Sequence, residues 1–437
     1  MPWETEGGAS ACPKGGGVWY DEQEKIFKMW YEASWCKNNA YAISKDGINW
    51  TRPDLGIVKG TNIIMPYDGY EPEKFTDGIK YLRPDSTTVF IDYEHPEQKY
   101  KLFLRNPGGL DNAIVATSKD GINFENFRYT TAKMGDRSTM FYNPFRKKWV
   151  YSVRMSDLIN DDWVRYRKYR ECDDYLEGAT WSDEDCKKWL DVDEKDLPNP
   201  YINDTPQLYN VDCVGYESIM LGMFQIHYGP SNQVVEKSGA PKITELMPMY
   251  SRDGYHFSRP SRQAIINASM YKGAWDRGYV QSVGGGVIVL ENEIRIYYIA
   301  YAGDEEHGGE HFSTNGLYRN GATGFATLRR DGFVSMNGKG ELCTRLLTVS
   351  GKQSFHVNVQ GKVVVSILDE NKNVLAVSNE FDGDSTNQKL DFNGFDVSTL
   401  NNKNFYINFD VDGKLYSFGF ADKHGDFGGA HAGGFVK

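Results

Sequence analysis

Short runs of apolar and aromatic residues alternate with turn residues along most of this chain, a pattern typical of β-strands. Lys25 to Tyr31 and Ile294 to Ile299 are two such runs. A turn phrase follows several of them: Ser44-Lys45-Asp46-Gly47-Ile48-Asn49-Trp50 returns as Ser118 to Phe124 and as Ser251 to Phe257. Asp-Gly supplies the positive φ of a tight turn, and the aromatic residue packs on the next strand. Each copy therefore predicts a hairpin.

The phrase has two weaker copies, Arg330-Asp331-Gly332-Phe333 and Trp181-Ser182-Asp183. One supersecondary unit copied in series buries the face of each copy against the next. Five copies predict a five-bladed β-propeller, and an unrelated stack of β-meanders is the alternative. We expect the turns on successive blades, at Asp46, Asp120, Asp183, Asp253 and Asp331.

The last hundred residues have a different pattern. Phe355 to Val359 and Phe405 to Phe409 alternate without a helical period, which predicts a β-sandwich. Asn337 to Gly340 has the composition of a linker. The fold class is therefore all-β, with a propeller over 1–336 and a smaller β-sandwich over 341–437. The one helix that the pattern predicts lies at 184–190.

Composition narrows the function. The net charge of −11 argues against nucleic acid, which needs a basic stripe. No apolar run is long enough to span a bilayer. The six cysteines lack zinc-site spacing, and we expect thiols or a disulfide between Cys172 and Cys186. The glycine runs Gly15–Gly17 and Gly284–Gly286 lack the phosphate-loop pattern, and we expect them where inner strands crowd the propeller axis.

No cofactor motif is present, and we expect no cofactor. A loop with His307, Glu310 and His311 is a weaker metal candidate, and its side chains are more often solvated than ligating. The sequence gives no further support for a structural metal ion.

In a propeller the inner strands start around one mouth of the central channel, and polar residues there converge from different blades. The second and third blades offer Asp85 and Asp136 at these starts. Arg137, His227 and Trp35 are candidate substrate contacts. The fifth blade offers four more: Trp275, Asp276, Arg277 and Gln281.

The fourth blade has two registers. If residues 207–211 form the inner strand, Glu217 lies at the far mouth. If the inner strand begins at Glu217, its spacing to the Asp253 turn matches the spacing from Asp85 to Asp120. We prefer the second register, which places Glu217 with Asp136 at the active mouth.

Several carboxylates around one mouth suit glycosidic bond cleavage, in which one carboxyl donates a proton and another stays ionised. Glu217, Asp136 and Asp85 are the predicted catalytic residues, and Arg137 would lower the pKa of a neighbouring carboxyl. The structural alternative is that an aspartate at a strand start only caps a turn.

Tyr216-Glu217-Ser218 and Trp275 to Ser282 resemble segments of five-bladed propeller glycoside hydrolases related to families 43 and 32, in a group found in bacterial polysaccharide degradation. The resemblance covers the whole chain and implies an exo-acting glycosidase for plant or algal oligosaccharides, with a C-terminal β-sandwich. It also implies a periplasmic or secreted location, although a signal peptide is not present in this chain. Asp136 matches the middle aspartate of these families, and Glu217 matches their acid.

The first blade departs from the family pattern, because Lys14-Gly15-Gly16-Gly17 stands where the catalytic aspartate is expected. Two other functions therefore stay open. One is a lyase or dehydratase for uronic-acid saccharides, with His227 or Tyr228 as base and Arg137 or Arg277 neutralising the carboxylate. The other is a carbohydrate-binding propeller without activity.

Overall fold

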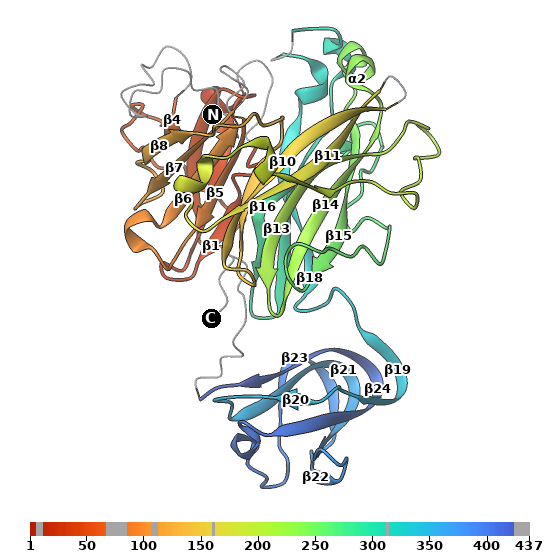
Figure 1. The fold of residues 1–437 in the computed structure, drawn as a ribbon. Coiled ribbons are helices and arrows are strands. Elements are labelled where there is room, and N and C mark those ends of the chain that lie inside the picture. The colour runs from red at the N-terminus through yellow and green to blue at the C-terminus, as the bar shows by residue number, and fades with distance from the viewer. Residues whose placement is uncertain (6–11, 67–84, 106–111, 160–161, 312–313, 424–437) are drawn as a thin grey trace. The chain divides into compact units, whose positions relative to one another are not determined.

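The computed structural model describes residues 1–5, 12–66, 85–105, 112–159, 162–311 and 314–423 (Figure 1). The chain forms two compact units. The first contains Met1–Ile288 and Ile296–Ala326, and the second contains Val289–Arg295 and the described chain from Thr327 onward. No helix in these ranges is long and apolar enough to cross a membrane.

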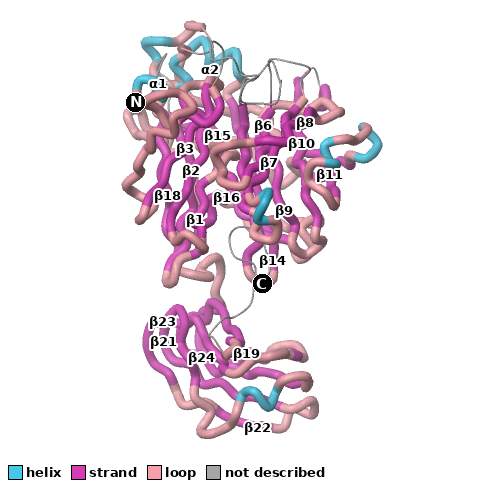
Figure 2. The backbone as a smooth tube through the Cα atoms, turned by 90° about the vertical axis from the view of Figure 1, so that its left-hand side faces the viewer, coloured by secondary structure: helices cyan, strands magenta, loops and turns pink. Residues whose placement is uncertain are grey.

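Five antiparallel sheets follow one another along the first unit, and together they form a five-bladed β-propeller, as predicted (Figures 1 and 2). In chain order they are β1 (Val18–Asp21), β2 (Ile26–Ala33), β3 (Asn38–Ser44) and β4 (Ile63–Met65); β5 (Asp85–Ile91), β6 (Tyr100–Arg105), β7 (Ala113–Ser118) and β8 (Glu125–Tyr129); β9 (Thr139–Asn143), β10 (Lys148–Ile159), β11 (Asp162–Cys172) and β12 (Lys187–Leu190); β13 (Gln207–Tyr216), β14 (Ile219–Gly229) and β15 (Ile243–Ser251); and β16 (Gly278–Val289), β17 (Glu293–Tyr301) and β18 (Gly321–Arg329).

The repeated turn has the same hydrogen bonds in its three full copies. The hydroxyls of Ser44, Ser118 and Ser251 accept from the N–H groups of the next aspartate and glycine. The aspartate Oδ1 then accepts from the two N–H groups that follow the glycine. All five turns come after the third strand of successive blades, which confirms their predicted order.

Side chains of one blade hydrogen-bond to the turn of the next. Trp30 Nε1 donates to the carbonyl oxygen of Gly121 at 2.7 Å, and Asn143 Nδ2 donates to that of Asp253 at 2.9 Å. Tyr297 Oη donates to the carbonyl oxygen of Gly47 at 2.8 Å and so joins the fifth blade to the first. The repeat therefore also specifies how neighbouring blades pack.

The two glycine runs meet where the ring closes. The N–H of Gly284 donates to the carbonyl oxygen of Lys14 at 3.1 Å. A Cβ atom on Gly284 would lie 2.1 Å from the carbonyl oxygen of Gly15, well inside van der Waals contact. Crowding at the axis thus explains the glycines, as expected from the sequence.

The structure corrects the register of the fourth blade. β13 pairs with β14 from Gln207↔His227 to Tyr216↔Ile219, so Glu217 lies in the hairpin turn at the end of the inner strand, with a φ of 49°. The preferred register was wrong because helix α2 (Asn232–Ser238) lies between β14 and β15 and lengthens the spacing to Asp253. Figures 1 and 2 show α2 at one end of these strands.

The predicted helix at 184–190 is also wrong. Ser182 and Asp185 form a capping box that supports a single 3₁₀ turn, Asp183–Asp185. The following residues form β12, which pairs with β11 at the blade edge. The short helix α1 (Pro2–Thr5) precedes the first blade. All six cysteines are free thiols, including Cys172 and Cys186.

The second unit is the smaller β-sandwich. Its central strands β21 and β24 pair along most of their lengths and enclose buried side chains such as Phe355, Val365 and Phe409. The predicted linker at 337–340 is instead part of β19, which pairs with β24. The strands are β19 (Met336–Cys343), β20 (Leu347–Thr348), β21 (Ser354–Leu368), β22 (Val374–Val377), β23 (Phe381–Leu390) and β24 (Asn404–Ala421).

Candidate functional site

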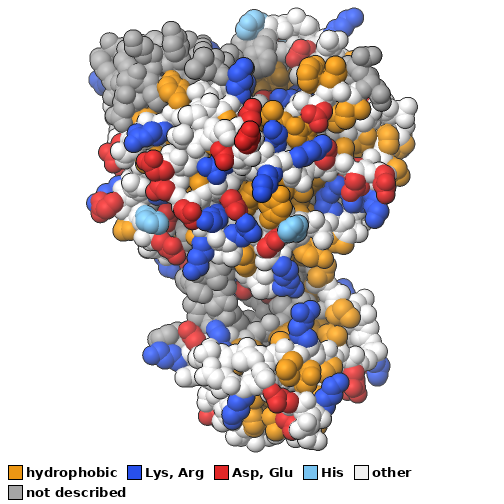
Figure 3. All heavy atoms as spheres, in the orientation of Figure 1, with side chains coloured by type: hydrophobic (Ala, Val, Ile, Leu, Met, Phe, Trp, Pro, Cys, Tyr) orange, Lys and Arg blue, Asp and Glu red, His pale blue; other side chains and the backbone are white. Residues whose placement is uncertain are grey.

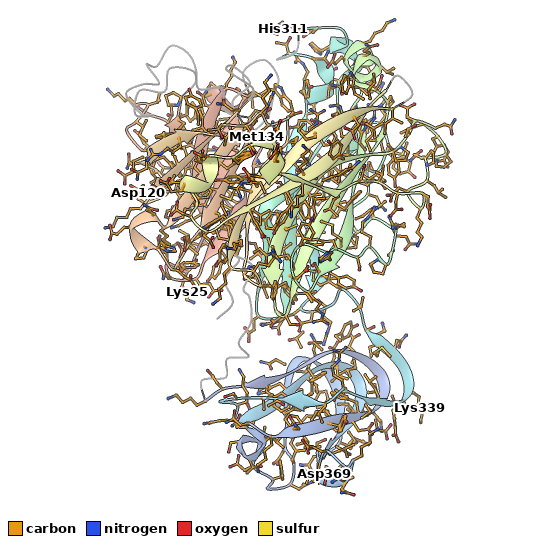
Figure 4. The ribbon with its side chains drawn as sticks, viewed as in Figure 1. Lys25, Asp120, Met134, His311, Lys339 and Asp369 are labelled. Carbon is orange, nitrogen blue, oxygen red and sulfur yellow. The ribbon has the colours of Figure 1, made fainter. Side chains whose placement is uncertain are left out.

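The five inner strands begin around one cavity of about 480 Å³ in the first unit. Each blade contributes a lining residue near the start of its inner strand: Lys14, Asp85, Asp136, Tyr209 and Tyr279. His311, which also lines the cavity, and Lys25, in the β1–β2 turn, lie at opposite ends of the unit in Figure 4. Inner strands run in one direction around a propeller, so Glu217 belongs to the end that holds Lys25.

Four of the residues predicted for the site line this cavity: Trp35, Asp85, Asp136 and Arg137. The others do not, and Glu217 is remote from it for the reason given above. Eleven further lining residues were not among the predicted site residues: Lys14, Cys36, Arg105, Arg165, Tyr209, Asn232, Glu236, Lys242, Tyr279, His311 and Tyr318.

The fifth-blade loop candidates have partners outside the cavity. The Trp275 ring lies 5.2 Å from the Tyr298 ring, and a Cβ atom on Gly324 would touch it. Arg277 pairs with Glu305 at 2.7 Å. The carbonyl oxygen of Asp276 accepts from Ser269 N at 3.0 Å, which fixes the loop.

His227 and Gln281 are buried behind the cavity rather than on its wall. The His227 ring centroid lies 5.7 Å from that of Tyr209. Burial, followed by the charges of Lys242 and Arg165, holds the pKa of His227 well below its usual range, so the imidazole is neutral. Burial also raises the pKa of Tyr228 to about 12, which argues against this residue as a base.

Lys14 is the centre of a buried ion cluster. Its Nζ lies 2.7 Å from Glu32 Oε2 and 3.0 Å from Asp85 Oδ1, and it stands over the Trp35 ring at 4.2 Å from the centroid. Glu32, Cys36 and Asp85 together have the spacing of a metal site. The ammonium group of Lys14 already supplies the positive charge that both carboxylates need, so these residues fit a lysine rather than a metal ion.

The cluster gives its two carboxyl groups, Asp85 and Glu32, different pKa values. Burial alone would raise the pKa of Asp85, but Lys14, Arg105 and a hydrogen bond with Asp136 outweigh it and lower that pKa. Burial dominates at Glu32 and raises its pKa to about 7 despite Lys14. Asp85 is therefore held ionised beside a carboxyl group that gains or loses a proton near neutral pH.

Asp136 is half-buried and lines the cavity. It contacts Asp85 across two blades, and its charge acts on Tyr209, Tyr279 and Tyr318. Trp35 and Tyr318 stack with their ring centroids 3.8 Å apart and give the cavity an aromatic wall.

Arg137 follows Asp136 and has the left-handed φ of 61°. Its N–H donates to Ser86 Oγ at 3.2 Å, and its carbonyl oxygen accepts from Arg167 NH1 at 2.7 Å. Arg167 also donates to the carbonyl oxygen of Tyr209 at 2.5 Å. This buried arginine of β11 thereby fixes the backbone of two cavity residues from different blades.

Tyr209 has an unusual environment for a buried tyrosine. Its Oη lies 2.8 Å from Tyr279 Oη and accepts from Lys242 Nζ at 3.3 Å. Burial alone would raise the pKa of Tyr209, but the charges of Lys242 and Arg165 and the Tyr279 hydrogen bond outweigh it and lower that pKa. The phenol is thus a stronger acid than an ordinary tyrosine.

Helix α2 brings Glu236 and Asn232 to the rim of the cavity. The carbonyl oxygen of Glu236 accepts from Gly309 N at 2.7 Å and from Asn315 Nδ2 at 2.8 Å. The loop that carries His311 therefore holds the helix in place. Of the metal-candidate loop, His307 pairs with Asp304 at 2.7 Å, and only His311 lines the cavity.

No family model matches the chain, and no curated protein matches it. Solved structures resemble it at low identity. An N-acetylgalactosamine deacetylase from F. plautii is 13% identical over 74% of this chain and 95% of that one, with a TM-score of 0.47. The exo-beta-1,3-galactanase from Phanerochaete chrysosporium is 12% identical over 96% and 98%, with a TM-score of 0.43.

The fructofuranosidase from Schwanniomyces occidentalis is 12% identical over 94% of this chain and 96% of its own, with a TM-score of 0.38. At these identities and scores the matches carry no inference about which residues act or on what substrate. The function must be argued from the cavity itself.

Proposed function

We propose that this protein is a glycoside hydrolase and that the cavity at the starts of its inner strands is the active site. The observation that supports this is the set of three carboxyl groups, Asp85, Asp136 and Glu236, around one cavity with an aromatic wall. Glycosidic cleavage needs one carboxyl that donates a proton and another that stays ionised.

The contacts of Asp136 suit the proton donor. Lys14 and Arg105 hold Asp85 ionised, which makes Asp85 a poor proton donor. We therefore assign the donor role to Asp136, which is open to the cavity. Asp85 acts as a positioning residue, since it is fixed by two cations beside Asp136.

Glu236 is the remaining carboxylate and takes the second role, either activating a water molecule or attacking directly. It comes from α2 at the rim, whereas Asp85 touches Asp136 and is too close to it for that role. We further propose action at chain ends, because five inner strands surround the cavity and favour a saccharide end over its middle. Plant and algal oligosaccharides, met outside the cytoplasm, are the proposed substrates.

The test is an incubation with such oligosaccharides while reducing ends and the ultraviolet absorbance of unsaturated uronates are followed together. Reducing ends without absorbance are expected. D136N and E236Q should each lower kcat by about 10²–10⁴ with little change in KM, since each keeps shape and removes one proton-transfer group. The matched control is E217Q at the far end of the fourth blade, which should keep full turnover. Equal loss in E217Q would contradict this site.

One observation favours elimination as a second candidate. The lowered pKa of Tyr209 makes its phenolate accessible as a base beside Lys242 and Arg165, which could neutralise a uronate carboxylate. This assigns the base to Tyr209 instead of His227 or Tyr228. Absorbance that appears in step with the reducing ends, and that is lost in Y209F, would establish elimination and exclude hydrolysis.

A further inference from the structure

The cavity contains cations that its own carboxylates do not neutralise. Lys14 and Arg105 are paired with Asp85, at 3.0 Å and 3.6 Å. Arg137, Arg165 and Lys242 line the side formed by the third and fourth blades. In the described part of the chain, none of these three has an ion pair with a carboxylate.

Arg137 is the strongest case. Arg137 is only 2% exposed, and none of its three guanidinium nitrogens has a hydrogen-bond partner among the described residues. Asp212 acts on it at longer range, but the Asp212 carboxylate already accepts from Ser282 Oγ and from Asn210 Nδ2. Leaving a buried charge without hydrogen bonds is costly unless a ligand supplies them.

Lys242 and Arg165 extend this arrangement. Lys242 is 2% exposed, and its Nζ lies 4.8 Å from the Tyr279 ring centroid and donates to Tyr209 Oη. Arg165 donates to the neutral Gln207 Oε1 at 2.5 Å. Among the described residues, Arg165 and Lys242 thus donate to neutral partners, and the Arg137 guanidinium group donates to none.

The positive charge of the cavity contrasts with the net negative charge of the whole chain. The chain carries a net charge of −11, and acidic and basic side chains are interspersed over the face in Figure 3. Positive charge inside a cavity with low-dielectric walls focuses the local potential on an anionic ligand. Arginine also binds carboxylate and sulfate groups through two parallel hydrogen bonds.

We propose that the cavity binds a saccharide with an anionic substituent, a carboxylate or a sulfate, and that Arg137, Arg165 and Lys242 hold this group. The inference rests on the proposed function, since it names the substrate class of the same site. Asp136 and Glu236 come from the same two blades as these cations, so the anionic group lies beside the scissile bond.

Binding is measured by calorimetry, which requires no turnover. The probes are D-galacturonate, D-galactose 6-sulfate and neutral D-galactose. One of the two anionic sugars is expected to bind roughly tenfold or more tightly than galactose, because hydrogen bonds to charged groups are worth more than neutral ones. Tighter binding of galacturonate alone would identify a carboxylate site, and tighter binding of galactose 6-sulfate alone would identify a sulfate site. Equal binding of all three sugars would overturn the proposal.

Variants test whether these three side chains bind the anionic group, rather than the overall positive charge of the cavity. R165Q and K242Q should each weaken the preferred anionic sugar about tenfold and leave galactose unaffected. R137Q should do the same, and the other two variants keep the test decisive if it does not fold. R277Q is the matched control, because Arg277 pairs with Glu305 outside the cavity. Unchanged anion binding in both R165Q and K242Q would refute the assignment.

The outcomes also separate the two proposals. Selective binding of an anionic sugar without bond cleavage would contradict the hydrolase and support the anion site. Hydrolysis of neutral oligosaccharides with no preference for anionic sugars would support the hydrolase and contradict the anion site.

Discussion

Lys14 sets the charge state of the site from a single position. Its ammonium group pairs with Glu32 and Asp85 at the start of the first blade. This lysine stabilises the ionised form of Asp85 but leaves Glu32, which is fully buried, with a pKa raised to about 7. A carboxyl group that changes charge near neutral pH inside the fold has a measurable effect on stability.

The first prediction concerns E32Q. The pKa of Glu32 rises from 4.5 in the unfolded chain to about 7 in the folded protein. The native state therefore binds more protons between these values, and ionisation of Glu32 lowers the free energy of unfolding as pH rises through this window. We expect E32Q to gain stability relative to the wild type from pH 4.5 to 7, by up to about 3 kcal/mol.

Urea denaturation at several pH values measures this difference. The control is E97Q, because Glu97 is exposed and pairs with the exposed Lys119. The E97Q curve should stay parallel to the wild-type curve across the same window. If the E32Q curve is also parallel, Glu32 does not titrate in this range.

At the scale of elements, the sequence predicts what local patterns determine. Alternation and the repeated turn identify the blades, because each turn closes its own hydrogen bonds within a few residues. Asp85, Asp136 and Arg137 follow from the rule that inner strands start at one mouth. Tyr209 would have followed too, had the inner strand been placed at residues 207–211.

The other site residues depend on tertiary structure. Arg165 and Lys242 come from β11 and from the segment before β15, and no local pattern places those positions at the mouth. Glu236 lies on a helix inserted between strands, which also misled the register of the fourth blade. An insertion changes the spacing of a repeat without leaving a pattern of period two, so spacing alone could not reveal it.

The second prediction concerns this inserted helix. Gly239 ends α2 with a φ of 72°, and a Cβ atom there would lie 2.3 Å from the carbonyl oxygen of Asp304. G239A should displace α2 and with it Glu236. We expect kcat/KM to fall about a hundredfold, since a shift of about 1 Å in a catalytic group has effects of this size.

The control for this prediction is G273A. Gly273 has a φ of 90° but open space around it, so alanine there adds about 1–2 kcal/mol of backbone strain without a clash. Both variants should lose some stability, and only G239A should lose activity. Equal activity in the two variants would mean that the position of α2 does not matter for catalysis.

At the scale of the whole propeller, the ring is closed by noncovalent contacts between the first and fifth blades. The Gly284–Lys14 hydrogen bond and the Tyr297–Gly47 hydrogen bond join segments that are far apart in the sequence. The same junction carries Lys14 into the cavity. The contacts that close the ring therefore also position a residue of the site.

The third prediction follows from this junction. A methyl group in G284A would meet the backbone of Gly15 at 2.1 Å, where no side chain can move aside. We expect the free energy of unfolding to fall by about 1–3 kcal/mol or more, as is typical of overpacking. Binding at the cavity should also weaken, because Lys14 shifts.

All ten tryptophans lie at or before Trp275, so tryptophan fluorescence follows unfolding of the propeller and not of the β-sandwich. The control is G383A in β23, where the new methyl group would meet only the edge of the Phe381 ring, at 3.0 Å. G383A should leave the fluorescence midpoint in urea unchanged, whereas G284A should lower it. A G284A midpoint equal to that of G383A would show that the glycine junction does not hold the ring closed.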